Sequence, residues 1–161
     1  MLTWFKKNHN PDEPQTLGQI GEALARLEYE RRGYEVVAAN FFNRKGKQLG
    51  EVDFIAAGRG AVMFVEVKTR AREWGLHGTP AEAVNYFKQV KLLKAVKVFL
   101  AKQPKYRSLR PQIDVVTVIL PEQSGLMLAQ TNPDKFEVAG ELDKLSRNVT
   151  ILPNAVEDRF S

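Results

Sequence analysis

Residues 62–65, Val-Met-Phe-Val, constrain the fold more than any other part of the chain. Side chains of a strand alternate between two faces, so a strand that is apolar on both faces must be covered on both. This run predicts a central strand, at 61–70, in a sheet with other elements packed on its two sides. The strand continues into Glu66, Val67 and Lys68, and a carboxylate and a lysine at the end of a buried strand need a physical reason.

Further β-type runs are expected around this strand. Residues 51–57 precede it and are joined to it by Gly58-Arg59-Gly60, which predicts an antiparallel hairpin. Runs rich in Val and aromatic residues predict strands at 34–42 and 113–120. Weaker runs predict short strands at 126–130, 136–138 and 149–152.

Two amphipathic helices are expected to cover the sheet. The first begins at Leu17 and ends at a C-cap near Gly33. Its apolar face consists of Leu17, Ile20, Leu24 and Leu27. The second begins at Pro80 and ends near Ala101, with one apolar side and one lysine-rich side. The order helix, strand, hairpin, helix, strand predicts an α/β domain with a mixed central sheet flanked by helices.

Length and charge limit the remaining possibilities. The 161 residues suit one core domain at 17–120, a flexible N-terminal arm at 1–16 and a C-terminal extension at 121–161 that packs on the core. Lys and Arg outnumber Asp and Glu by 24 to 19, for a net charge of +5. This favours a polyanionic partner such as nucleic acid, although an ordinary basic protein has the same balance.

Two absences in the sequence also matter. No run of about 20 apolar residues predicts a membrane span. The chain has no cysteine, which excludes disulfides and thiolate zinc sites and fits a cytoplasmic location.

Strand alternation brings Asp53 and Glu66 to one face of the predicted hairpin. With a two-residue loop at Gly58-Arg59, Asp53 pairs with Phe64 and is a diagonal neighbour of Glu66. With a four-residue loop at 58–61, Asp53 lies directly opposite Glu66. Both registers keep the acids together, whereas a one-residue slip would separate them.

Two converging carboxylates either shift a pKa or bind a cation. Magnesium prefers one or two carboxylates together with waters and phosphate oxygens, and Lys68 adds a positive charge on the same face. Asp53, Glu66 and Lys68 therefore indicate a catalytic site for phosphodiester hydrolysis with Mg²⁺ or Mn²⁺. Acid–lysine pairs on exposed sheets are also common as solvated partners.

Basic and hydroxyl side chains near this site are candidate phosphate contacts. They are Thr69, Arg70, Lys88 and Lys91. The lysines belong to a stripe on the second helix, Lys88, Lys91, Lys94 and Lys97, in which Lys88 is nearest the helix start and the site. An ordinary solvated helix face has the same pattern.

Six motifs occur in order along residues 17–119. They are Gly18-Gln19-Ile20-Gly21-Glu22-Ala23-Leu24-Ala25, Gly33-Tyr34 with Asn40, Gly50-Glu51-Val52-Asp53-Phe54-Ile55, Phe64-Val65-Glu66-Val67-Lys68-Thr69-Arg70, Gly78-Thr79-Pro80-Ala81-Glu82-Ala83-Val84 with Lys88, and Asp114-Val115-Val116. Together they resemble the YraN family of bacterial proteins. The arm at 1–16 and residues 121–148 exceed the compact core of that family.

The resemblance implies a restriction-endonuclease-like fold with an Asp…Glu-x-Lys core, related to archaeal Holliday-junction resolvases. It also implies that Glu22 reaches the same metal. The helix stripe Gly18, Glu22, Ala25 and Tyr29 agrees with this, because small residues would let the helix lie close to the sheet. A solvated helix acid would have the same spacing.

We therefore expect a magnesium-dependent endonuclease acting on DNA, with branched or damaged DNA as candidate substrates. Two alternatives stay open: a nucleic-acid-binding module with a vestigial or complex-dependent site, and a structural protein with a solvated acid–lysine patch. A duplex substrate would favour a two-fold homodimer, because two strands need two sites. Glu51 is a rival acid, His77 is expected as a loop residue, and Asp114 as a capping or arginine-paired acid.

Overall fold

Five strands form one mixed sheet in the computed structural model, which describes residues 16–42, 51–71, 86–120 and 148–156. In spatial order the strands are β1 (Glu35–Phe42), β2 (Glu51–Gly58), β3 (Ala61–Ala71), β4 (Arg110–Leu120) and β5 (Val149–Leu152). β3 and β4 are parallel, and every other neighbouring pair in this sheet is antiparallel.

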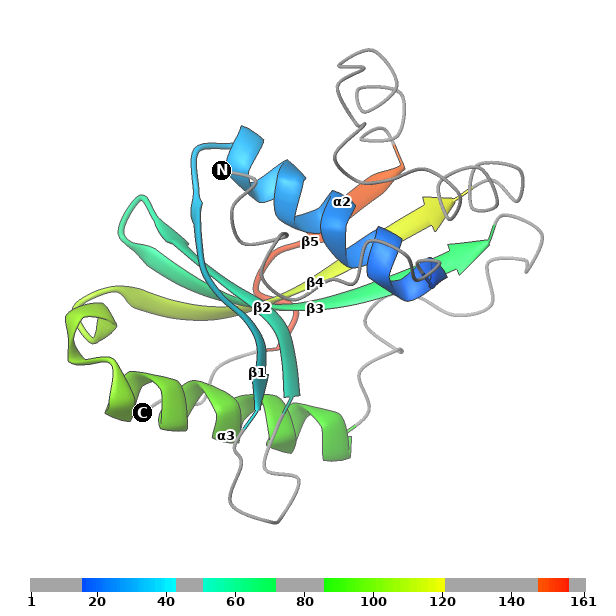
Figure 1. The fold of residues 1–161 in the computed structure, drawn as a ribbon. Helices are drawn as coiled ribbons and strands as arrows, with labels where there is room; N and C mark the ends of the chain where they lie inside the picture. The colour runs from blue at the N-terminus through cyan, green and yellow to red at the C-terminus, as the bar shows by residue number, and fades with distance from the viewer. Residues whose placement is uncertain (1–15, 43–50, 72–85, 121–147, 157–161) are drawn as a thin grey trace.

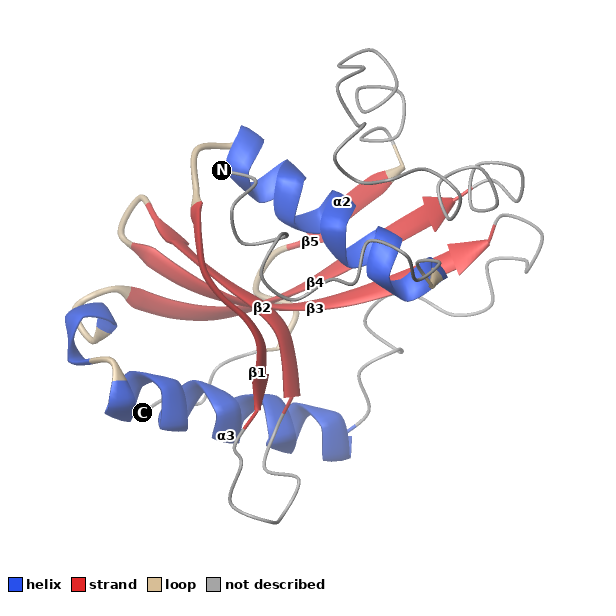
Figure 2. Ribbon diagram, viewed as in Figure 1, coloured by secondary structure: helices blue, strands red, loops and turns tan. Residues whose placement is uncertain are grey.

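Helices lie on both faces of the sheet (Figure 1). α2 (Leu17–Arg31) packs on one face and α3 (Tyr86–Lys102) on the other, and the 3-10 helix η1 (Pro104–Tyr106) leads from α3 towards β4. Figure 2 shows the strands as the middle layer between the two helices. The predicted α/β fold with a mixed, helix-flanked sheet is thus confirmed, and it is compatible with a restriction-endonuclease-like fold.

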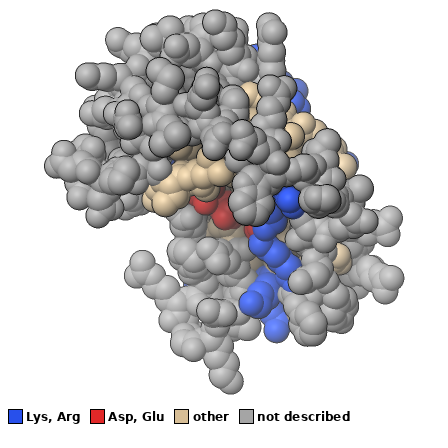
Figure 3. Space-filling model, turned by 90° about the vertical axis from the view of Figure 1, so that its right-hand side faces the viewer, with Lys and Arg blue, Asp and Glu red and all other residues tan. Residues whose placement is uncertain are grey.

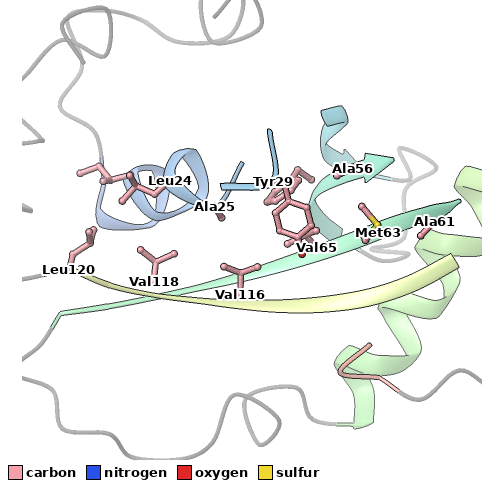
Figure 4. Close-up of a cluster of buried hydrophobic side chains, with 12 residues drawn as sticks. Leu24, Ala25, Tyr29, Ala56, Ala61, Met63, Val65, Val116, Val118 and Leu120 are labelled. Carbon is pink, nitrogen blue, oxygen red and sulfur yellow. The ribbon is translucent and has the colours of Figure 1, made fainter. Parts of the chain in front are cut away.

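β3 is the central strand that its apolar run predicted. Each of the four side chains at 62–65 is at most 2% exposed. Met63 and Val65 belong to the cluster under α2 (Figure 4). Val62 and Phe64 belong to the cluster under α3. The strand therefore contributes side chains to both hydrophobic cores, one on each face of the sheet.

α2 is defined by its N-terminal capping box and by the glycine that follows it. The Thr16 N–H donates to Gln19 Oε1 at 2.8 Å, and the Gln19 N–H donates to Thr16 Oγ1 at 3.2 Å. The helix ends just before Gly33, as predicted, and Gly33 has a φ of 85° that glycine adopts without strain.

The predicted apolar face of α2 is wrong at both ends. Leu17 is 36% exposed and Leu27 is 39% exposed, whereas the middle of the stripe is buried. The buried residues are Ile20, Gly21, Leu24, Ala25, Glu28 and Tyr29. The face of α2 that contacts the sheet includes small residues of the helix, because small side chains let a helix backbone lie close to the strands.

α2 approaches the sheet closely at Gly21. A Cβ added there would lie 1.8 Å from Thr69 Oγ1 and 2.8 Å from Thr69 Cβ. The sequence suggested the small residues Gly18 and Ala25 for this role. Ala25 is fully buried, but Gly18 is exposed, and a Cβ there would meet Thr16 Oγ1 at 3.9 Å. Gly21 therefore allows the helix to lie against β3, immediately before Glu22.

β4 begins at Arg110, three residues before the predicted start. Pro111 is the second residue of the strand. A proline is tolerated near the start of a strand and where no neighbour needs its missing N–H. β5 pairs with β4 at 115–118, so Pro111 lies beyond the end of β5.

Several predictions concern residues outside the described part of the chain. They are residues 1–15 of the arm predicted at 1–16, the helix start at 80–85, the loop with His77, the strands at 126–130 and 136–138, and the side chain of Glu51. The strand predicted at 149–152 is confirmed as β5. Neither described helix has the length and apolar character that crossing a bilayer requires.

The contact between Gly21 and Thr69 leads to a paired prediction. The Gly21→Ala variant should be destabilised by about 1–3 kcal/mol, because its Cβ would overlap Thr69 and force helix and sheet apart. The Gly18→Ala variant, made in the same helix where the new Cβ would meet Thr16 Oγ1 at an ordinary contact distance of 3.9 Å, should be stabilised by about 0.5–1 kcal/mol. Urea denaturation measures both, and equal effects of the two substitutions would contradict the close approach.

Candidate active site

The β2–β3 hairpin has the register that places Asp53 opposite Glu66. The last backbone pair of this ladder is Phe54 with Val65, so Asp53 and Glu66 come next along the two strands. The turn at 59–60 has a positive φ at both residues, 51° and 77°, as in a two-residue type I′ turn. Of the two predicted registers the second is therefore correct, although the loop has two residues and not four.

β2 and β3 separate at these two acids and form a fork. Beyond Phe54 and Val65, β2 remains paired with β1 while β3 remains paired with β4 (Figure 1). Within the fork, the backbone N–H of Val67 donates to Asp53 Oδ2 at 2.6 Å. The carboxylate thus accepts a hydrogen bond from β3 at the point where β2 moves away, which fixes its position.

Burial and neighbouring acids raise the pKa of Asp53 from 3.8 to about 7. Burial is the largest cause, and the negative charge of Glu66 is the next. The hydrogen bond from Val67 lowers the pKa, Glu22 raises it and Lys88 lowers it. Negative charge therefore accumulates around Asp53, which favours a proton or another cation at this carboxylate.

Glu66 lies on the α3 side of the sheet and is 4% exposed. Its Oε1 forms an ion pair with Lys68 Nζ at 2.8 Å, and it accepts a hydrogen bond from Lys88 Nζ in a second ion pair. Burial lowers the pKa of Lys88, but its hydrogen bond and charge interaction with Glu66 raise it above the usual value overall. The sequence placed Lys68 in the catalytic group and Lys88 among the phosphate contacts, and the structure brings both to one oxygen atom.

α2 contributes an acid and an arginine from the other side of the sheet. The negative charge of Glu22 reaches Asp53. Arg26, one turn further along, has a side chain that is 11% exposed, and its Nη1 lies 3.9 Å from Glu22 Oε2. Burial lowers the pKa of Arg26, while Glu22 and Asp53 oppose that shift.

Sequence reasoning missed Arg26 as a member of the site. The signal that could have found it is the spacing of Glu22 and Arg26, which at i and i+4 lie side by side on a helix. Three acids and three basic residues thus surround the fork. They are Glu22, Asp53, Glu66, Arg26, Lys68 and Lys88.

The acids of this site fit magnesium as a carboxylate pair. Within the described ranges, no group of three or more His, Cys, Asp or Glu side chains is arranged to hold a metal ion. Asp53 and Glu66 adjoin each other, and Glu22 approaches them from α2. Magnesium takes one or two carboxylates and fills its other positions with water and phosphate oxygens. The carboxylates at the fork are a set of ligands of the kind that magnesium takes.

The other predicted phosphate contacts have different surroundings. Thr69 packs against Gly21 of α2, so its contact with nucleic acid stays a prediction. Alternation puts Arg70 on the same face as Lys68, and Lys91 is exposed on α3. Figure 3, which shows the right-hand side of the molecule in Figure 1, has acidic atoms next to a column of basic side chains.

Asp114 is a structural acid and not part of the site. It is 2% exposed and accepts hydrogen bonds from the Tyr29 hydroxyl at 2.6 Å, Gln112 Nε2 at 2.9 Å and the Asn154 N–H at 2.9 Å. The expected arginine partner was wrong, because neutral donors from three separate segments surround this carboxylate, whereas the expected capping role is confirmed at the backbone N–H of Asn154. The network ties α2 and the segment after β5 to β4.

The fold and the fork define the class of protein: a three-layer α/β protein whose architecture is compatible with the restriction-endonuclease-like fold. The chain belongs to the uncharacterised protein family UPF0102, whose family model matches residues 21–118. That range contains every residue of the site described above. The resemblance to the YraN family is thereby confirmed.

Curated relatives agree with this family. The UPF0102 protein TTE1452 of Caldanaerobacter subterraneus is 36% identical over 113 residues, which cover 70% of this chain and 87% of the relative. The UPF0102 protein CLJ_B2665 of Clostridium botulinum is 34% identical over 105 residues, 65% of this chain and 80% of the relative. A UPF0102 protein of Alkaliphilus oremlandii is 42% identical over 84 residues, 52% and 67% of the two chains.

The raised pKa of Asp53 predicts how stability depends on pH in the metal-free protein. Between pH 3.8 and about 7, the folded state keeps a proton on Asp53 that the unfolded state has lost. The stability due to this proton is complete below the lower value and is lost as the pH rises to the upper one. The Asp53→Asn variant lacks this titration but keeps an oxygen for the Val67 N–H.

Thermal denaturation in EDTA measures the effect. The Tm of the wild type should fall relative to that of Asp53→Asn across this pH range and then level off. A Tm difference that stays constant over the range would show that Asp53 titrates as an ordinary carboxyl.

Proposed function

We propose that this protein is a magnesium-dependent endonuclease that hydrolyses phosphodiester bonds in DNA. The observation that carries the proposal is the fork, where Asp53 and Glu66 adjoin and Lys68 contacts Glu66. A carboxylate pair with an adjacent ammonium suits the cleavage of a phosphate ester, because both the attacking water and the charged phosphate need stabilisation. The chain keeps both acids and the lysine, which supports a site that turns over substrate and argues against a vestigial one.

Asp53 and Glu66 would hold the metal ion, with Glu22 as a further carboxylate from α2. A bound Mg²⁺ or Mn²⁺ supplies a Lewis acid that activates water and neutralises phosphate charge. The Val67 N–H keeps Asp53 aimed into the fork through its hydrogen bond. Lys68 keeps its ammonium 2.8 Å from Glu66 Oε1, where it can stabilise negative charge that develops on the phosphate.

Basic residues beside the fork support a nucleic-acid substrate. Arg70, Lys88 and Lys91 extend positive charge from the site along β3 and α3, and the whole chain has a net charge of +5. Neutralising backbone phosphates releases counterions, so binding through these residues should weaken as salt increases. Cleavage of both strands of a duplex would require two sites, which a two-fold homodimer supplies.

The absence of cysteine fits activity in the reducing cytoplasm. Branched or damaged DNA remains the proposed substrate because the family motifs resemble those of a superfamily that includes Holliday-junction resolvases.

A cleavage assay tests this function. Linear, nicked and four-way-junction DNA are incubated with wild type and the variants Asp53→Ala and Lys68→Ala, with Mg²⁺ or Mn²⁺. Each substitution should lower the cleavage rate on the order of 100-fold or more, because each removes a group that acts on the reacting phosphate. Lys94→Ala, which removes an exposed charge from α3, should have little effect.

The outcomes separate the proposals. Cleavage that survives both substitutions would show that the site is elsewhere. Binding of every DNA without cleavage under any metal condition would favour the nucleic-acid-binding module. Binding of none of these DNAs would argue for a structural role.

A further inference from the structure

Two ammonium groups share one oxygen of Glu66, and they come from different elements. Lys68 lies on the same strand, two residues further along β3, while Lys88 reaches across from α3. Glu66 is 4% exposed, and one ammonium already balances its charge. Charge balance at Glu66 therefore does not explain why a second ammonium group lies there.

Lys88 acts on both carboxylates of the fork. Its Nζ is paired with Glu66 Oε1, and its positive charge also lowers the pKa of Asp53. Reciprocally, Asp53 and Glu66 both raise the pKa of Lys88. The ammonium thus lies within electrostatic reach of the two groups that would hold a divalent cation.

Lys88 is also able to leave this position. Its side chain is 35% exposed, although its ammonium contacts a nearly buried acid. A lysine stem is long and flexible and can carry its charge to water without a backbone movement. Lys91, one turn further along α3, is already exposed.

We propose that the ammonium of Lys88 is a placeholder for the divalent ion: it pairs with Glu66 and partly offsets the negative charge at Asp53 in the metal-free protein, and it leaves Glu66 when the ion binds. The inference rests on the proposed function, because it assumes that these acids bind a metal. A placeholder reduces the repulsion between the acids while the site is empty, and it makes the metal compete with a protein cation. The released ammonium is then free to contact a substrate phosphate beside the ion.

Metal affinity in the absence of substrate tests the competition. Calorimetric titration with Mn²⁺ should show about tenfold tighter binding to Lys88→Met than to wild type, because the competing charge is gone and the apolar stem is kept. In EDTA, the same variant should have a lower Tm, because the acid pair has lost one of its cations. Lys94→Met, a matched loss of charge on the exposed side of the same helix, should change neither quantity.

Three outcomes would overturn the placeholder. Lys88→Met that binds Mn²⁺ as weakly as wild type, or more weakly, would make Lys88 a structural partner of Glu66. If Lys68→Met tightens Mn²⁺ binding as much as Lys88→Met does, the cause is the general loss of positive charge and not a specific role of Lys88. If the wild type binds no Mn²⁺, the metal centre of the proposed function fails together with this inference. The same follows if the Asp53→Asn variant binds Mn²⁺ as tightly as the wild type does.

Amine labelling of the wild type measures the movement itself. The protein is acetylated briefly with an amine-reactive ester in EDTA and in Mn²⁺, and modification at each lysine is quantified by mass spectrometry. Labelling of Lys88 should increase several-fold with Mn²⁺, while that of exposed Lys94 should stay constant. Unchanged labelling of Lys88 in a protein that binds Mn²⁺ would reject displacement while leaving the metal site intact.

Discussion

The hydrogen bond from the Val67 N–H to the Asp53 carboxylate is the interaction on which the charged site depends. It lies where β2 leaves β3, so a side chain accepts the N–H at the point where the strand ladder ends. A buried N–H without an acceptor is costly, and a buried carboxylate without donors is more so. Each group therefore stabilises the other, and Asp53 is held next to Glu66 despite their repulsion.

The two helices complete the site from opposite faces of the sheet. Gly21 allows α2 to touch Thr69, which brings Glu22 and Arg26 to the fork. α3 is anchored by its apolar side in the second core cluster and brings Lys88 to Glu66. The charges around the fork thus belong to separate elements, and each depends on tertiary packing. A local change in helix packing would alter the charge balance without touching a strand residue.

Much of the fold followed from side-chain periodicity. The doubly apolar run at 62–65 required a covered central strand, and the structure covers it with one helix on each face. Strand parity placed Asp53 and Glu66 together but left two registers open, since the sequence does not set which turn residues are unpaired. The apolar face of α2 was misjudged at Leu17 and Leu27, because periodicity alone does not show how closely a helix approaches the sheet.

The sequence by itself determined the order of the elements, the central strand, the family motifs and the pairing of Asp53, Glu66 and Lys68 on one face. These features depend on neighbours in the chain or on strand alternation, which are local properties. Tertiary structure alone decided that Lys88 shares an oxygen of Glu66 with Lys68, that Arg26 comes within reach of the charge of Asp53, and that Asp114 is satisfied by neutral donors. Those contacts join residues far apart in the chain, and their geometry is set by the packing of helices on the sheet.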